Sequence, residues 1–342
     1  MSKKRAGSRG VDPENLYESA DQLSPSEREK LAGRLLSTDT KEELAIRRLP
    51  EKTRTKLGLP IPVTIYIQDP LVAERDLKMG LLEIDIDWEP GLIDGPASAR
   101  VAVVDYDADT NVLTDPARWA KDKWCFIRPD GQPIGKEDSK SFQFHQLNVW
   151  AIIQKILNFF EDSSALGRRI PWAFEGNRLI VVPHAGWGEN AFYDRNSKSV
   201  QFYYCGTKER PVYTCLSHDI VAHETGHAIL DGIRPYYNEQ SSLQTAAFHE
   251  FFADLTAILV ALRNNVFRHV IEELTKGDLT KAEPLTSLAE QFSRDVMNRD
   301  YLRSAINGYT MEDVKIGRSP HDCSQALTGA MFDIMEKILP KR

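Results

Sequence analysis

Cysteine is scarce in this sequence, with four residues in a chain of 342. None of them belongs to a CxxC pair, the spacing that zinc knuckles use, and their wide separation disfavours a disulfide framework. We therefore expect a reducing, cytoplasmic environment. The four residues are Cys125, Cys205, Cys215 and Cys323.

Long apolar runs and blocks of one charge are also lacking. The basic N-terminal stretch MSKKRAGSRG is followed by polar sequence rather than by the apolar region of a signal peptide. We expect that no stretch approaches the roughly 20 apolar residues that span a bilayer, and hence no membrane segment. The formal charge of −7 comes from interspersed acids and bases, which argues against a nucleic-acid partner.

The hydrophobic pattern changes along the chain and predicts an α+β fold in three parts. Residues 1–60 are expected to be a flexible or helical extension. Residues 61–232 form a β-rich subdomain, because runs such as VTIYIQD and LLEIDIDW are separated by turn residues. This part contains a long helix over 145–160 and ends in a helix over 216–231. Residues 233–342 form a helical subdomain, with helices expected over 243–263, 270–274, 285–296 and 320–339.

Two histidines flank a glutamate in SHDIVAHETGHAI, within a run that carries almost no other charge. Residues four apart share one face of an α-helix, so His223 and His227 can direct imidazole nitrogens at one zinc ion. Glu224 lies about 100° further round the helix and is the candidate general base. The short motif also fits an ordinary buried helix, but its uncharged flanks favour a metal helix, since coordination offsets the desolvation of the polar groups.

A catalytic zinc site needs three protein ligands and one open position. The apolar helix AAFHEFFADLTAILVAL contains two acids one turn apart, Glu250 and Asp254, among aromatic residues. We expect Glu250 to be the third ligand and Asp254 to accept the remaining N–H of His223. Glu239, in a turn-like stretch, and His249, on a different helix face, are weaker ligand candidates.

The motif and its downstream acids resemble the thermolysin-like gluzincin metallopeptidases, whose zinc pattern is HExxH followed by ExxxD. The segment HAGWGENAFY, residues 184–193, is similar to the family's edge-strand segment H-x-G-x-G-x-N-A-F-W. The resemblance implies a thermolysin-like fold and one catalytic zinc ion, with the ligands already named. It also implies that Asn190 and Ala191 hold a peptide substrate in an extended conformation.

The resemblance extends to groups that stabilise the transition state in the family. The segment LRS, residues 302–304, looks like the family's arginine segment, which makes Arg303 the candidate donor to a substrate carbonyl. The segment SPHDCS resembles the one that holds the transition-state histidine, here His321. Independently of any family, Ser319 followed by Pro320 predicts a helix start, with His321 in the first turn.

A tyrosine between the zinc helix and the third ligand also binds the oxyanion in the family. Tyr237 is the candidate for this role, and Tyr236 is the alternative. By the same resemblance, Ile220 and Leu302 would line a pocket for an apolar residue after the cleaved bond.

The sequence departs from the family pattern at several positions. The calcium-binding acids after the third ligand are missing and only Asp219 matches a family calcium ligand, so calcium binding is doubtful. The acid that steadies the transition-state histidine is replaced by Ile316, which leaves Asp322, Asp313 or no residue to orient His321. The chain also ends soon after His321, so the helical part is minimal or the sequence is one part of a larger protein.

These observations predict a zinc-dependent metalloendopeptidase that hydrolyses peptide or protein substrates. Glu224 would take the proton of a water activated by zinc and deliver it to the leaving amine. The main alternative is a zinc-containing peptide-binding or regulatory module with weak or no turnover, because the support of His321 is altered and the C-terminal part is short. A metal-free scaffold, in which the apolar helices only pack together, is the third possibility.

Overall fold

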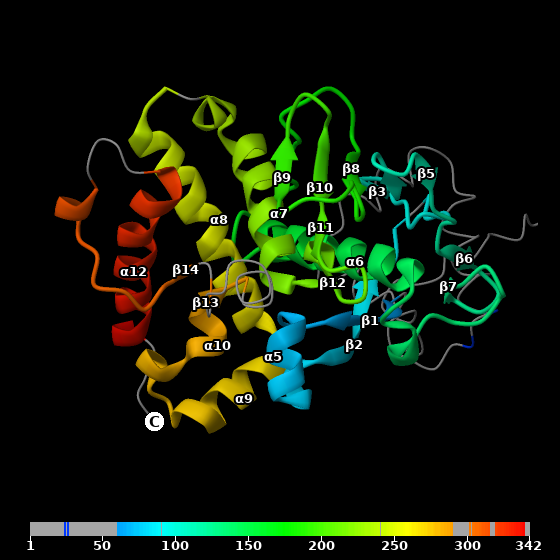
Figure 1. Cartoon of the computed structure of the whole chain (residues 1–342), viewed down its shortest axis with the longest axis horizontal. Coiled ribbons are helices and arrows are strands. Elements are labelled where there is room, and N and C mark those ends of the chain that lie inside the picture. The colour runs from blue at the N-terminus through cyan, green and yellow to red at the C-terminus, as the bar shows by residue number, and fades with distance from the viewer. Residues whose placement is uncertain are drawn as a thin grey trace, which may run out of the picture.

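The computed structural model describes residues 60–338 except 90, 240, 290–300, 302 and 315–318, together with Ser24 and Ser26. The described chain has a mixed α+β fold, with most strands before residue 214 and mainly helices after it (Figure 1). Nearly all of the predicted extension over residues 1–60 lies outside the described residues. Leu302 and Ile316 also lie outside them.

The largest described sheet has four strands in the order β3-β8-β10-β9. β3 and β10 run parallel to β8, whereas β9 is antiparallel to β10 and forms one edge of the sheet. This edge matters below because β9 carries the predicted peptide-binding segment. The bounds are β3 Val101–Val103, β8 Leu179–Val182, β9 Ala191–Asp194 and β10 Ser199–Phe202.

The other described strands pair as two-stranded ribbons. The period-2 runs VTIYIQD and LLEIDIDW contribute β1 and β2, as predicted, and Ile61, Val63 and Ile65 of β1 are buried. In the remaining ribbons each strand is only two or three residues long. The bounds are β1 Pro60–Tyr66 with β2 Leu81–Asp87, β4 Tyr106–Asp107 with β5 Val112–Leu113, β6 Arg118–Ala120 with β7 Cys125–Ile127, β11 Tyr204–Gly206 with β12 Pro211–Tyr213, and β13 Ser287–Leu288 with β14 Arg303–Ser304.

Helix α6, Phe142–Glu161, is the buried helix of the strand-rich half and confirms the helix predicted over 145–160. Ser141 caps it, since its Oγ accepts a hydrogen bond from the backbone N–H of Phe144 at 3.1 Å. Its apolar face packs against β1, β3 and the next long helix, with Trp150 and Ile153 inaccessible to solvent. The helix therefore joins the sheet to the helical half.

Three long helices form the helical half, namely α7 His218–Ile233, α8 Leu243–Arg263 and α12 Pro320–Ile338. α8 packs against both α7 and α12 (Figure 1). At the contact between α7 and α8 a Cβ atom on Gly226 would lie only 3.0 Å from Ala253 Cα and 3.2 Å from Thr256 Oγ1. Glycine in the HETGH motif thus allows a close approach of the two helices that carry the predicted ligands.

Among the described helices, α8 is long and apolar enough to cross a membrane by length and composition. The expectation that no segment approaches this limit is therefore wrong for α8. A core helix of a soluble protein passes the same test, and 56% of the apolar window of α8 is buried inside the fold. The packing against α7 and α12 accounts for this hydropathy without a membrane.

The remaining described helices are shorter, and one prediction is wrong over three residues. A helix was expected over 285–296, but α10 ends at Thr286, the chain then enters β13, which pairs with β14, and residues 290–296 lie outside the described residues. The paired residues are about 15 positions apart in sequence, so the pattern of apolar residues within one segment cannot predict that they pair. The bounds are α5 Pro70–Arg75, α9 Asn265–Thr275 and α10 Glu283–Thr286.

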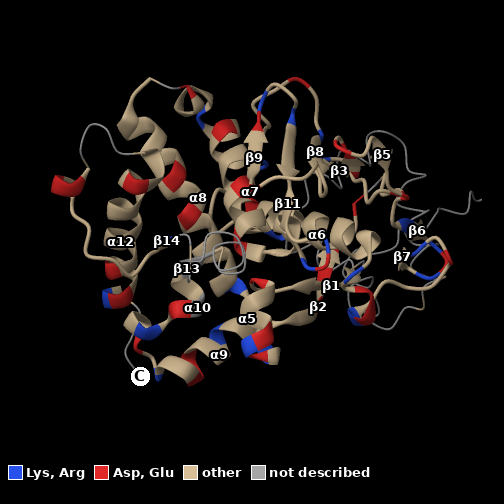
Figure 2. Cartoon of the chain, in the orientation of Figure 1, with Lys and Arg blue, Asp and Glu red and all other residues tan. Residues whose placement is uncertain are grey.

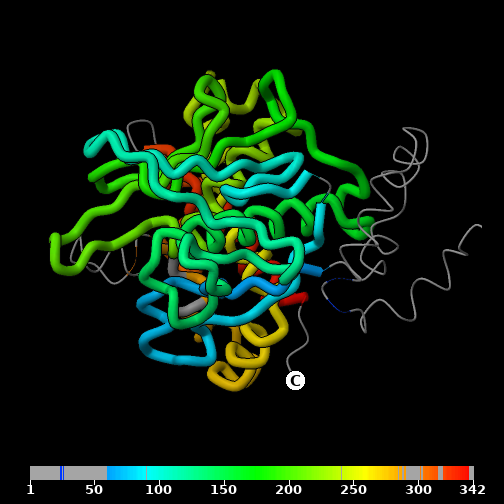
Figure 3. The backbone as a smooth tube through the Cα atoms, turned by 90° about the vertical axis from the view of Figure 1, so that its right-hand side faces the viewer, coloured from blue at the N-terminus to red at the C-terminus, as the bar shows by residue number. Residues whose placement is uncertain are grey.

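Charged residues are distributed over both halves of the molecule (Figure 2). The view turned by 90° shows the segment that links β1 to β2 beside α9 at the base of the molecule (Figure 3). There Lys78 Nζ lies 3.0 Å from Glu273 Oε2, across an exposed ion pair between the two halves. Such an exposed pair adds little stability, so the buried contacts of α6 and α7 hold the halves together.

Candidate metal centre

Helix α7 holds the two histidines and the glutamate of the motif, with His223 and Glu224 buried and His227 half-buried. The imidazole rings of His223 and His227 meet edge to face, and their Nε2 atoms are 3.1 Å apart. Two nitrogens that bind one zinc ion at tetrahedral angles are about 3.3 Å apart, given Zn–N bonds of about 2.0–2.1 Å. The spacing of the two nitrogens therefore fits a shared metal ion.

Helix α8 adds the carboxylate of Glu250 to the two imidazoles. Its Oε2 lies 3.3 Å from His223 Nε2, and its Oε1 lies 3.7 Å from His227 Nε2. The ligand atoms of His223, Glu224 and His227 also lie within 4.8 Å of one another. The buried group thus offers two imidazoles and two carboxylates that could hold a metal ion, and Glu250 contacts both imidazoles.

The Oε2 atom of Glu250 is buried and receives no well-directed hydrogen bond from the described residues. The Nε2 atoms of His223 and His321 approach it at 3.3 and 3.2 Å. Burial lowers the pKa of His223, but its close contacts with the carboxylates of Asp254 and Glu250 together outweigh burial and raise that pKa to about 10. Without a metal ion a proton supplies the positive charge at this place, and a metal ion that binds there would displace it.

Glu224 lies beside this group and is 7% exposed. Its Oε2 accepts a hydrogen bond from the backbone N–H of Tyr193 in β9 at 3.1 Å. Burial raises the pKa of Glu224 to about 7, with the opposing effect of His223 too small to cancel it. A carboxyl group with a pKa near neutrality can both take and return a proton at physiological pH.

Asp254 lies behind His223, one turn after Glu250 on α8. Its Oδ1 is 2.8 Å from His223 Nδ1, which is the contact that the sequence analysis expected. The guanidinium of Arg303 also donates two hydrogen bonds to Asp254, from Nη2 to Oδ1 at 2.8 Å and from Nε to Oδ2 at 3.2 Å. Burial alone would raise the pKa of Asp254, but Arg303 and His223 together lower it.

The pairing of Arg303 with Asp254 was not expected from the sequence. Arg303 lies in β14, far from α8 along the chain, and was assigned only to a substrate carbonyl. Its guanidinium has five N–H donors, and Asp254 takes two of them. Three donors remain for another acceptor, so both contacts are compatible.

His249 occupies a position that the sequence analysis undervalued. Its Nδ1 lies 2.6 Å from Nδ1 of His227, and the two rings stack with centroids 4.8 Å apart. When Nε2 of His227 faces a metal ion, Nδ1 carries the proton and donates it to His249. His249 therefore supports a ligand rather than acting as one, and its position next to Glu250 was the available signal.

Comparison with known proteins gives no family assignment. The chain matches no known protein-family model, and no curated protein matches it at a significant level. The function is therefore inferred from the motifs and from the geometry of the buried group.

His321 contacts the proposed metal ligand Glu250, whereas Tyr237 packs against Phe248. His321 lies in the first turn of α12, and its Nε2 contacts Glu250 at 3.2 Å. Of the acids considered for orienting it, Asp322 accepts hydrogen bonds from Ser319 at the helix start. The ring of Tyr237 packs edge-on against Phe248, with centroids 5.7 Å apart, and Tyr236 is 83% exposed.

The predicted peptide-binding residues lie on the free edge of the sheet. Asn190 immediately precedes β9, and its side-chain Oδ1 accepts from the backbone N–H of Ala191 at 2.9 Å. Two residues on, the N–H of Tyr193 bonds Glu224, so the edge strand runs directly past the candidate base. Ile220 is half-buried on α7, and its expected neighbour Leu302 lies outside the described residues.

Asp219, the one match to a family calcium ligand, is occupied by protein groups. Its Oδ1 accepts from the backbone N–H of Ile220 at 2.9 Å and from the hydroxyl of Ser217, and its Oδ2 accepts from the N–H of Ala289. Burial raises the pKa of this carboxyl. In this arrangement Asp219 fastens the start of α7 to the segment after β13.

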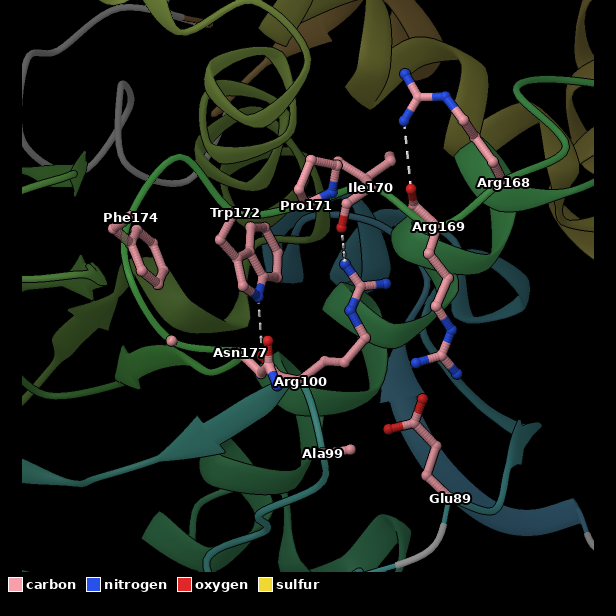
Figure 4. Close-up of a pocket in the computed structure, with 11 residues that line it drawn as sticks. Glu89, Ala99, Arg100, Arg168, Arg169, Ile170, Pro171, Trp172, Phe174 and Asn177 are labelled. Atoms are coloured by element: carbon pink, nitrogen blue, oxygen red, sulfur yellow. Dashed lines mark hydrogen bonds between the residues drawn. The ribbon is translucent and has the colours of Figure 1, made fainter. Parts of the chain in front are cut away.

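A pocket of about 770 Å³ lies elsewhere, next to Arg100 and Trp172 (Figure 4). Its lining residues brace one another: Arg100 Nη2 donates to the carbonyl of Ile170 at 2.6 Å, and Trp172 Nε1 donates to the carbonyl of Arg100 at 3.3 Å. Arg100 also pairs with Glu161. The pocket shares no residue with the histidine group, and the chemistry is concentrated at the latter.

Proposed function

We propose that this protein is a zinc-dependent metallopeptidase of the thermolysin-like type. One observation carries the proposal: the two HETGH histidines and Glu250 converge from two closely packed helices, with Glu224 buried beside them. His223, His227 and Glu250 would hold the zinc ion. When bound, zinc supplies a Lewis acid that polarises a carbonyl and lowers the pKa of water.

Glu224 is the proposed general base. The backbone N–H of Tyr193 holds its Oε2, which leaves Oε1 to accept the proton of the attacking water. The pKa of about 7 that burial gives Glu224 suits both this step and the return of the proton to the leaving amine. Glu224 is only 7% exposed, which limits the access of bulk water to this exchange.

The substrate would bind as an extra strand along β9. A peptide pairs with the free edge of a sheet through backbone hydrogen bonds, and Asn190 and Ala191 are the predicted partners at this edge. The strand order supports this mode, since β9 is the terminal strand of the described sheet. The N–H of Tyr193 ties the same edge to Glu224, so a bound peptide would lie within reach of the base.

Arg303, His321 and Tyr237 are the proposed donors to the oxyanion. Arg303 is held rigidly by Asp254 and retains three N–H donors. The side chain of His321 is 53% exposed beside Glu250, where a substrate can reach it. Removal of one such donor typically reduces kcat by about 10²–10³-fold.

A second candidate function is a zinc-containing peptide-binding or regulatory module with weak or no turnover. The specific observation in its favour is that Nε2 of His321 already contacts Glu250 and that Tyr237 packs against Phe248. In such a module these groups would stay with their protein partners when a peptide binds. The edge strand and the zinc ligands would be retained.

The test compares wild type with Glu224→Gln on casein and on a mixed peptide library, together with the zinc content of each protein. The glutamine keeps an oxygen that can accept from Tyr193, so the fold and the zinc ligands should be retained. A metallopeptidase loses about 10²–10⁴-fold of its activity in this variant at equal zinc content. Glu239→Gln, at a glutamate whose side chain is 61% exposed, is the matched control and should change nothing.

Equal and negligible cleavage by wild type and Glu224→Gln, with zinc bound, would favour the binding module. Less than about half an equivalent of zinc in protein prepared without chelators would refute the zinc assignment itself.

A further inference from the structure

A second group of metal-ligating side chains lies in the strand-rich half, where the proposed peptidase function does not use it. His145 in α6, His184 after β8 and Cys215 in the 3-10 helix Thr214–Leu216 before α7 are all buried. His145 Nδ1 is 2.8 Å from His184 Nε2, and Cys215 Sγ is 4.0 Å from the same nitrogen. The three ligand atoms lie within 4.8 Å of one another.

The outer nitrogens of both histidines face acceptors. His184 Nδ1 lies 2.7 Å from the carboxylate Oδ1 of Asp105, whose Oδ2 accepts from Gln146 Nε2 at 2.8 Å. His145 Nε2 lies 3.1 Å from the backbone carbonyl of Ser139. In a neutral ring, which has a single N–H, each outer nitrogen carries that N–H and donates it outward.

The inner nitrogens of His145 and His184 consequently both carry lone pairs, and they face each other at 2.8 Å. Two lone pairs at this distance repel unless a cation lies between or beside them. Histidines that bind metals show this same arrangement, with the second ring nitrogen donating to a carboxylate or a backbone carbonyl.

We propose that His145 Nδ1, His184 Nε2 and Cys215 Sγ bind a second metal ion of the borderline-soft class, of which Zn²⁺ is the example. Imidazole and thiolate ligands select such ions. The charges also balance, because the Cys215 thiolate and the Asp105 carboxylate neutralise a divalent ion inside the protein. A tetrahedral zinc ion requires N–N and N–S separations of about 3.3 and 3.6 Å. The two nitrogens, at 2.8 Å, would move apart, and Cys215 Sγ, at 4.0 Å from His184 Nε2, would move closer, which leaves one coordination position for a further ligand.

The competing occupant is a proton shared by the two imidazoles, with Asp105 as the counter-ion. A shared proton engages only the two facing nitrogens, 2.8 Å apart, and leaves the Cys215 Sγ, 4.0 Å from His184 Nε2, without a part in the arrangement. A metal ion engages all three side chains at once.

The proposed ion would join three segments that are far apart in sequence. His145 belongs to the central helix, and His184 begins the loop that leads to Asn190 and β9. Cys215 directly precedes the helix that carries HETGH. The ion would therefore fix the peptide-binding edge relative to α7.

The thiolate makes this site distinguishable from the first one, whose ligands contain no sulfur. Full-length protein is stripped with a chelator and reloaded with Co²⁺, and the near-ultraviolet thiolate-to-cobalt charge-transfer band is recorded with the bound cobalt. Wild type should show the band and bind about two equivalents. Cys215→Ser should lose the band and about one equivalent, while Cys205→Ser, at another buried cysteine, should retain both.

His227→Ala separates the two sites, because it should lose about one equivalent and keep the band. If Cys215→Ser does not fold, the band in wild type and in His227→Ala decides the question. Absence of the band in wild type would leave the shared proton as the occupant and overturn the proposal. Its persistence in Cys215→Ser would overturn it as well.

Discussion

The Asp254→Asn substitution isolates the buried residue that serves both His223 and Arg303. The side chain of Asp254 is 1% exposed and that of Arg303 is 10% exposed, so neither charge is solvated. Asparagine keeps the size and one acceptor oxygen but removes the negative charge. The guanidinium of Arg303 is then left without its counter-ion in a dry environment.

The magnitude follows from this burial. Removal of one partner of a buried ion pair costs about 3–5 kcal/mol of unfolding free energy. Because the asparagine oxygen can still accept one hydrogen bond, we expect the lower end, about 3 kcal/mol, in metal-free protein. Loss of the acceptor that orients a ligand histidine weakens metal binding by about 10–100-fold, so zinc affinity should fall as well.

Urea unfolding of the metal-free proteins measures the first effect, and competition with a chelator measures the second. Glu273→Gln removes one partner of the exposed pair with Lys78 and is the control, for which we expect no measurable change. Arg303→Met added to Asp254→Asn should recover stability, because it removes the unpaired charge. A cost of Asp254→Asn no larger than that of the control, or a double variant less stable than the single one, would refute the reasoning.

The same pair predicts a dependence on pH. The pKa of Asp254 is lower in the folded protein than its ordinary value. Its contribution to stability is therefore complete above the ordinary aspartate pKa and is lost as the pH falls through the lower folded value. The difference between wild type and Asp254→Asn should shrink in acid, and unfolding curves at several pH values measure it.

Three further predictions concern the same helices. Metal-free Glu224→Gln should gain stability relative to wild type as the pH rises from about 5 to 7. Burial raises the pKa of Glu224 to about 7, so ionisation of Glu224 destabilises the folded wild type over this range. A stability difference that is constant with pH in unfolding experiments would contradict this. Gly226→Ala should cost about 1–3 kcal/mol and weaken zinc binding, whereas Gly135→Ala, which meets no atom within 4 Å, should alter neither in thermal unfolding and chelator competition. His249→Ala should reduce zinc affinity by about 10–100-fold, and His249→Asn, which keeps an acceptor for His227, should recover most of it.

The long helices could be predicted because their signals are local. α8 spans residues 243–263 as expected, between the caps Ser242 and Asn264. The motif spacing likewise predicts that His223 and His227 share a face, since this follows from the helical repeat alone. Glu250 and Asp254 could be predicted as site residues because they are acids within an apolar helix, which is also a local signal.

The supporting contacts could not be predicted, because they join distant segments. The fork between Arg303 and Asp254 depends on the position of β14 beside α8, and β14 in turn pairs with β13. The second histidine group combines α6, the end of β8 and the turn before α7, and its cysteine was read only as evidence against CxxC sites. The spacing of residues along the chain does not predict contacts between segments so far apart in sequence.

The free edge of β9 has a consequence for the behaviour of the protein in solution. An unpaired strand edge can recruit any extended chain, including another copy of the same protein. Here the N–H of Ala191 is bonded by Asn190 and the N–H of Tyr193 by Glu224, so two donors of the edge are already engaged. These bonds leave fewer open donors for another copy of the chain, which disfavours self-association along this edge.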